Sequence, residues 1–195
     1  MKFFKPLLVL LTVTTASLSD AGVITFDDHP LATQNGVRGI GNYAGFDFSP
    51  TLEVIDTVGS PSWNYGSVSG DFTMLNNYGG VGVVRDENLA DFTFDGLWAR
   101  TWSNYNTPRT GYIRGFNNGT EIWTSIINLT TSWAQYGPVS GLAIDELRLD
   151  LGNYFLVDDL ALNEGTFSPV PDRGLTALLL GSCLLGLGFV RRRLG

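Results

Sequence analysis

Hydrophobic and polar residues alternate in short runs through the middle of the chain, and clusters of Gly, Asn, Ser and Thr separate these runs. A period of two places successive side chains on opposite faces of a strand, whereas a long run of helical period is absent. The pattern predicts about nine or ten strands, in the neighbourhood of residues 23–26, 45–48, 71–75, 80–84, 91–95, 97–102, 111–116, 120–129, 142–151 and 154–162.

Turn residues between these runs predict how the strands connect. Asn117, Asn118 and Gly119 predict a tight hairpin, because Asn and Gly accept positive φ. A second turn is expected at residues 76–79, and Gly96 is expected to end the strand at 91–95. Many short strands separated by turns favour an antiparallel β-sandwich of two packed sheets over residues 22–168.

Residues 1–21 have the three parts of a secretory signal peptide. Lys2 and Lys5 precede an apolar run at residues 7–13, and small residues follow up to Ala21. The apolar run is shorter than the ~20 residues of a membrane span. We therefore expect export and cleavage after Ala21, with cleavage after Ala16 or Ser19 and an uncleaved anchor as the alternatives.

The other end of the chain predicts a membrane segment. Residues 175–190 are uncharged and rich in Leu, at the low edge of the ~17–25 residues that cross a bilayer, and three arginines follow. The arginines would stay on the cytoplasmic side, so the middle of the chain would face outward. The alternative is a buried C-terminal helix, which the terminal arginines disfavour. Cys183 in this segment is interpreted as a small apolar residue.

The last part of the chain, residues 169–195, resembles the PEP-CTERM class of sorting signals of Gram-negative bacteria, in its VPDSG variant. A short motif at 170–174 precedes the transmembrane helix and the Arg cluster, although Arg173 replaces the usual Ser. The resemblance implies processing by an exosortase, a membrane-embedded cysteine protease, after transient insertion in the inner membrane. The residues that carry it are Val170, Pro171, Asp172, Gly174, Arg191, Arg192 and Arg193.

The middle of the chain is also similar to a recurrent PEP-CTERM ectodomain. The matching pieces are an I-T-F-D-D strand at 24–28, the Tyr43, Gly45 and Phe46 element, an F-x-F strand at 92–94 and an F-x-x-D-D-L strand at 155–160. This resemblance implies a jelly-roll sandwich like those of galactose-binding and carbohydrate-binding modules.

Composition and charge exclude several functions. The chain of 195 residues has a net charge of −7, and the predicted sandwich has six arginines, no lysine and 17 acidic residues, a net −11. Such a surface repels phosphate backbones and argues against nucleic-acid binding. One His and one Cys exclude a Cys/His zinc site and a disulfide framework.

The sequence gives little support for an enzymatic function. A Ser-His-Asp arrangement would depend on His29, which we interpret as a solvated loop residue. The acids of 145–150 superficially resemble a jelly-roll glucanase motif, but their order and spacing differ. An ordinary strand with Glu146 and Arg148 on one face is favoured, and we expect a protein that is not an enzyme.

Two pairs of acids suggest a calcium site. Asp27 and Asp28 end the first predicted strand, and Asp158 and Asp159 lie in the last. First and last strands often pair in such sandwiches, adjacent carboxylates repel without a cation, and hard oxygen ligands suit Ca²⁺. By the resemblance such a site would be structural, with Asp28 and Asp159 preferred. The alternative is acids that discourage pairing between sheet edges.

Two aromatic clusters in loop-like segments are candidates for glycan binding, because an exposed aromatic there favours a ligand. The alternative is that they pack over sheet edges as core, which is the interpretation given to Trp98, Trp123 and Trp133. Arg114 is a possible further donor. The candidate residues are Trp63, Tyr65, Trp102, Asn104, Tyr105 and Arg109.

The sequence therefore predicts an exported, exosortase-sorted and non-enzymatic protein of the cell envelope or extracellular matrix, with a structural or exopolysaccharide-associated role. The alternative is a carbohydrate-binding module with a defined glycan ligand. A glycoside-active enzyme is the least favoured hypothesis.

Overall fold

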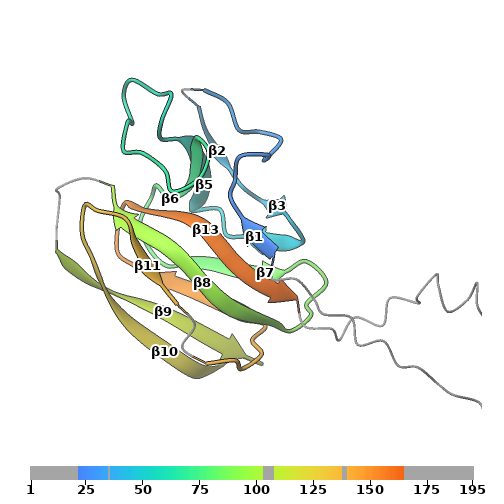
Figure 1. The fold of residues 1–195 in the computed structure, drawn as a ribbon. Coiled ribbons are helices and arrows are strands. Elements are labelled where there is room, and N and C mark those ends of the chain that lie inside the picture. The colour runs from blue at the N-terminus through green and yellow to red at the C-terminus, as the bar shows by residue number, and fades with distance from the viewer. Residues whose placement is uncertain (1–21, 35, 103–107, 138–139, 165–195) are drawn as a thin grey trace, which may run out of the picture.

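The computed structural model describes residues 22–34, 36–102, 108–137 and 140–164 as an all-β sandwich (Figure 1). The described residues form thirteen strands in two antiparallel sheets and contain no helix, which confirms the predicted fold class. No helix in this part of the chain is long and apolar enough to cross a membrane. The predicted signal peptide and C-terminal sorting signal lie outside the described residues.

The larger sheet, sheet A, has seven strands, and the smaller, sheet B, has six. The order in sheet A is β11 (Ala134–Tyr136), β8 (Phe92–Thr101), β13 (Phe155–Glu164), β6 (Phe72–Asn76), β5 (Leu52–Asp56) and β2 (Val37–Gly39), with β1 (Gly22–Ile24) also paired to β13. The order in sheet B is β10 (Thr120–Leu129), β9 (Arg109–Asn117), β12 (Glu146–Asp150), β7 (Gly82–Asp86), β4 (Phe46–Phe48) and β3 (Asn42–Tyr43).

The main core lies between the two sheets and is rich in phenylalanine. Phe94 from sheet A stacks on Trp123 from sheet B with ring centroids 5.7 Å apart, which confirms the prediction that Trp123 is core. Burial of such large apolar side chains is the main favourable term in folding. The largest fully buried aromatic residues are Phe26, Phe48, Phe92, Phe94 and Phe155.

The β9–β10 hairpin around Asn118 confirms the predicted turn, but the turn predicted at Gly96 is wrong. Gly96 lies inside the single strand β8, opposite Ala161, where β13 has a bulge. Its φ is +147°, and a Cβ there would lie 3.1 Å from the carbonyl oxygen of Tyr136. A glycine is needed here for close approach of the backbone rather than for a turn.

Four observed strands were not predicted. Three of them, β2, β3 and β11, have only two or three residues. The fourth, β5, has buried residues on both faces and therefore lacks the alternation that marks a half-exposed strand. The strand predicted at 142–151 is shorter than expected, because β12 begins at Glu146 and only Ile144 before it forms a bridge, to Phe92.

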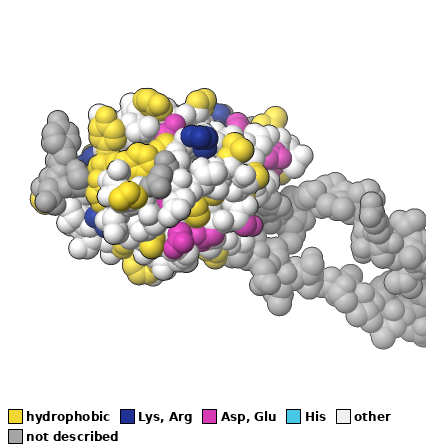
Figure 2. All heavy atoms as spheres, turned by 90° about the horizontal axis from the view of Figure 1, so that it is seen from above, with side chains coloured by type: hydrophobic (Ala, Val, Ile, Leu, Met, Phe, Trp, Pro, Cys, Tyr) yellow, Lys and Arg dark blue, Asp and Glu magenta, His cyan; other side chains and the backbone are white. Residues whose placement is uncertain are grey.

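The described chain begins and ends at the same end of the sandwich. β1 and β13 are antiparallel and Gly22 pairs with Leu162, which confirms the predicted pairing of first and last strands. At ~3.3 Å per residue the ten residues of β13 span roughly 30 Å. Its other end, at Phe155, pairs with Thr101. Figure 2 shows hydrophobic side chains gathered toward that far end of the molecule.

Candidate functional site

A second, smaller apolar cluster lies outside the main core, on sheet A. Ile55, Leu75 and Leu156 belong to three strands of this sheet, are fully buried and form a cluster separate from the residues between the sheets. The β5–β6 loop, residues 57–71, covers them together with side chains that follow β8 and β10. We call the partly exposed aromatic residues of this cover the aromatic surface: Trp63, Tyr65, Trp102 and Trp133.

The aromatic surface brings together the two aromatic clusters proposed for glycan binding. The ring of Trp102 lies 4.6 Å from that of Tyr65 and 6.5 Å from that of Trp63, centroid to centroid. All three side chains are partly exposed, so they are neither core nor free loop residues. They form one continuous apolar surface that a ligand could contact.

Arg100 lies in the middle of this surface and was not singled out from the sequence. Its guanidinium carbon is 5.7 Å from the centre of the Tyr65 ring and 5.8 Å from that of Trp133, and the group donates a hydrogen bond to the carbonyl of Tyr65. Burial lowers the pKa of Arg100 and raises that of Tyr65. The signal in the sequence was the spacing of Trp98, Arg100 and Trp102 at every second residue, in β8 and directly after it.

Two of the tryptophans predicted as core are placed differently. Trp98 is partly exposed, and its partner in the neighbouring strand β11 is the exposed Gln135. Trp133 is also partly exposed, and its indole N–H donates to the carbonyl of Gly66, 3.2 Å away. Neither side chain is part of the main core: Trp98 lies on a partly exposed face of β8, and Trp133 lies between β10 and β11, where it packs on the small apolar cluster.

The carboxylate of Asp158 holds the 57–71 loop against sheet A. Asp158 is fully buried and accepts hydrogen bonds from the backbone N–H groups of Val68, at 2.7 Å, and Ser69, at 3.1 Å. Burial raises its pKa to about 6, although these hydrogen bonds act in the opposite direction.

The other three acids proposed for calcium also have partners in the chain. Asp159, at a bulge with φ of 46°, accepts from the hydroxyl of Ser69 at 2.5 Å. Asp27 accepts from the backbone N–H groups of residues 71 and 72, at 2.7 and 3.1 Å. Asp28 accepts from the hydroxyl of Tyr43, and burial together with Asp28 raises the pKa of that hydroxyl.

These hydrogen bonds give three of the four acids a role in fastening the loop. Gly70 lies so close to Asp27 that a Cβ would be 2.0 Å from the carboxylate oxygen, and its φ is +52°. Within the described residues, no group of three or more His, Cys, Asp or Glu side chains gathers as a metal site would require. The arrangement adds no support to the calcium site, which stays a prediction.

The remaining candidates lie elsewhere. Arg109 belongs to sheet B, where burial lowers its pKa and its guanidinium donates to the carbonyl of Asn153. Asn104, Tyr105 and the motif at 170–174 lie outside the described residues.

The prediction of a solvated His29 is wrong: only 4% of it is exposed, its Nδ1 accepts from the N–H of Leu31, and its Nε2 lies 3.1 Å from the carbonyl oxygen of Ile40.

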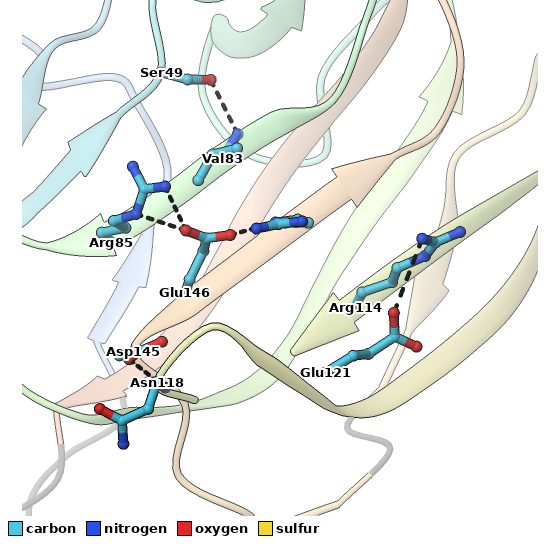
Figure 3. A network of polar contacts seen from close by, with 9 residues as sticks. Ser49, Val83, Arg85, Arg114, Asn118, Glu121, Asp145 and Glu146 are labelled. Carbon is cyan, nitrogen blue, oxygen red and sulfur yellow. Dashed lines mark hydrogen bonds and ion pairs between the residues drawn. The ribbon is translucent and has the colours of Figure 1, made fainter. Parts of the chain in front are cut away.

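The outer face of sheet B carries charged side chains in pairs instead of an aromatic cover (Figure 3). Glu146 points between Arg85, whose Nε is 2.7 Å from its Oε2, and Arg148, which shares its face of β12 as predicted. Arg114 lies 3.5 Å from Asp150 and, more loosely, 3.9 Å from Glu121. Glu146 is paired with its two arginines, and two of the guanidinium groups cover aromatic rings: Arg148 lies 3.8 Å from the centre of Phe116 and Arg114 lies 4.9 Å from that of Tyr112.

A shallow hollow of about 350 Å³ lies beside this network. Asp145 lines it and accepts from the backbone N–H of Asn118, 2.7 Å away, and Glu146 lines it while paired to its two arginines. The two adjacent acids are therefore engaged in structural contacts.

No protein-family model matches the sequence, and no curated protein sequence matches it. Solved structures with a similar arrangement of strands include TmCBM61 in complex with β-1,4-galactotriose, at 10% identity and a TM-score of 0.36, covering 63% of this chain and 90% of that chain. The CBM22-1–CBM22-2 tandem domain from Paenibacillus barcinonensis Xyn10C is 10% identical, with a TM-score of 0.44, and the match covers 82% of this chain and 49% of that one. The C-terminal family 22 carbohydrate-binding module of Clostridium thermocellum Xyn10B is 12% identical, with a TM-score of 0.40, covering 78% and 98%.

Proposed function

We propose that this chain is an exported, non-enzymatic β-sandwich protein that associates with polysaccharide through its aromatic surface. The observation that carries the proposal is the contact of Trp63 and Tyr65 with Trp102, with tilted rings, as one partly exposed group. An apolar patch of this kind on a soluble domain marks a binding surface, and flat aromatic rings offer contact to the apolar face of a sugar ring.

Polar groups suited to sugar hydroxyls border the aromatic surface. Asn64 is exposed between Trp63 and Tyr65, and Arg100 lies between the rings of Tyr65 and Trp133. A few polar groups within an apolar contact area are typical of sites that bind small molecules. The competing proposal is a purely structural matrix protein, in which the aromatic residues only cover the apolar cluster on sheet A.

The position of the aromatic surface suits a domain that is tethered by its end. The described chain begins and ends beside the Gly22–Leu162 pair, and Trp102 donates its backbone N–H to Tyr154 at the opposite end, roughly 30 Å away along β13. A tail that follows Glu164 would hold the sandwich with its aromatic surface turned away from the attachment point. The predicted sorting signal at residues 169–195, read by an exosortase, would supply such a tether.

Affinity electrophoresis tests the glycan proposal. The protein is run through gels that contain xylan, β-1,4-galactan or exopolysaccharide from the producing culture, together with Trp102→Ala and Tyr78→Ala. Tyr78 is 74% exposed between β6 and β7, is not one of the residues of the aromatic surface, and serves as the control. We expect retention of the native protein and of Tyr78→Ala on at least one polysaccharide, and loss of most retention with Trp102→Ala. Equal mobility of all three proteins in every gel would favour the structural proposal.

Replacement of Pro171 and Asp172 by alanine tests the sorting proposal. Export depends on residues 1–21 and is expected to continue, whereas processing at the motif is expected to stop. The variant should accumulate at the inner membrane, as measured by fractionation and intact mass. Release into the medium at the native level would contradict the role of the motif.

A further inference from the structure

The strand at one edge of sheet B differs from the other edge strands. β10 has ten residues and, within the described chain, pairs only with β9, whereas β2, β3 and β11 at other sheet edges have two or three residues each. Short edges are one means by which proteins prevent pairing with other chains, and charged residues or proline are others. β10 has a single charged residue, Glu121, and no proline or lysine.

The exposed side chains of β10 are suited to strand pairing. Ile126 is 68% exposed and Ile122 is 36% exposed, with the exposed Thr124 between them. The two-residue period of a strand gives these three residues the same orientation, and all are β-branched, the class most favoured in sheets. An edge of this composition offers unpaired backbone groups beside an apolar row.

One end of this edge is already closed. The hydroxyl of Tyr136 donates to the backbone carbonyl of Asn128, 2.6 Å away, where the chain leaves sheet B. At the other end, a bulge separates Glu121 from Trp123. The stretch from Trp123 to Ile127 between them is regular and open, and Thr124, four residues before Asn128, directs its backbone groups to the same side as the Asn128 carbonyl.

We infer that β10 pairs antiparallel with β10 of a second copy of this chain, about a two-fold axis through Thr124. In this register Ile122 of each copy lies opposite Ile126 of the other, and Thr124 lies opposite itself. Self-pairing of one strand makes a closed, isologous dimer and removes the longest edge of the sandwich. The two sheets B join into one continuous sheet, and each exposed isoleucine gains an apolar neighbour.

The dimer goes beyond the proposed function and is independent of it. β10 lies at the edge of sheet B, whereas the aromatic surface lies on sheet A, so both copies keep their aromatic surfaces free. Two such surfaces on one particle would bind a polymer with higher avidity than one.

Sedimentation equilibrium of the full chain, purified in a mild detergent, tests the dimer. We expect a dimer that Ile126→Lys converts to monomer, because a charge in the middle of an edge strand opposes pairing. Leu89→Lys, at a residue that is 80% exposed in the β7–β8 loop, is the control and should remain dimeric. Unchanged circular dichroism of Ile126→Lys shows that the fold is kept. A native chain that is monomeric at all concentrations would overturn the inference.

Cysteine cross-linking tests the register even if Ile126→Lys unfolds. In a Cys183→Ser background, Thr124→Cys places two thiols within reach of each other across the axis, since opposed Cβ atoms in antiparallel strands lie ~5 Å apart. Thr120→Cys is the matched control, because its two copies would lie roughly 26 Å apart. With diamide as oxidant, we expect a covalent dimer to form at least tenfold faster with Thr124→Cys. Equal rates for the two variants would overturn this register and the pairing it describes.

Discussion

The outer faces of the two sheets differ in how they are covered. Sheet A carries a buried apolar cluster beneath the 57–71 loop and the aromatic surface, whereas the outer face of sheet B carries ion pairs such as Arg85–Glu146, in which the arginine is exposed and the glutamate is mostly covered. One face has a small core of its own, and the other is a solvated surface of an ordinary antiparallel sheet. This difference is the reason for placing the proposed glycan contact on sheet A.

The largest difference between the faces is expected in stability. Leu156 is fully buried beneath the aromatic surface, and Leu156→Ala leaves a cavity that should lower the free energy of unfolding by about 3 kcal/mol. Val83→Ala, at a partly exposed position of sheet B, is the control and should cost less than about 1 kcal/mol. Urea unfolding measures both. Equal losses for the two variants would mean that the cover of sheet A contributes no core of its own.

The loop that covers sheet A should respond to pH through Asp158. Burial raises the pKa of this carboxyl from 3.8 to about 6 in the folded protein, so between these values the folded state binds the proton more readily than the unfolded state. The contribution of Asp158 to stability is then fully present below pH 4 and is lost as the pH rises through 6. The change is on the order of 3 kcal/mol.

Thermal or urea unfolding from pH 4 to pH 7.5 measures this effect, with Asp158→Asn as the reference that cannot titrate. The free energy of unfolding of the native protein, taken relative to Asp158→Asn, should fall as the pH rises. A difference that increases with pH would contradict the assignment.

The smallest effect is expected on sheet B. Glu146→Gln keeps an acceptor between Arg85 and Arg148, whose side chains are 46% and 39% exposed and can be hydrated. The loss in free energy of unfolding should stay below about 1 kcal/mol and should shrink in molar salt, because partly exposed ion pairs are weak and screened. A salt-independent loss several times larger would show that the network is a buried structural core, as on sheet A.

The difference between the faces also explains which strands and site residues could be predicted from the sequence. Strands with one exposed face, such as β9 and β10, alternate cleanly, and their hairpin was predicted together with its turn. β5 has both faces buried, so its apolar run lacks a period of two and was missed. The aromatic residues of the site were identified, but only the structure brings Trp63 and Tyr65 together with Trp102, because contacts between distant loops leave no local pattern.

The acids show a similar limit of sequence patterns. Asp158 lies in the last strand as predicted, whereas Asp27 lies beyond β1, which ends at Ile24. The observed partners of both are backbone N–H groups of the 57–71 loop. A carboxylate that binds a cation and one that accepts backbone hydrogen bonds look identical in a sequence. His29 likewise looked like a solvated loop residue, because nothing in the sequence indicates its contact with the carbonyl of Ile40.

Chemical-shift mapping with exopolysaccharide from the producing culture tests the central claim most directly, because it observes both faces in one experiment. Indole N–H signals of Trp63 and Trp102 report on sheet A, and backbone signals of Tyr112 and Arg148 report on sheet B. The account predicts that the sheet A signals shift in a saturable manner while those of sheet B stay in place. Shifts confined to sheet B, or none on the aromatic surface, would contradict it.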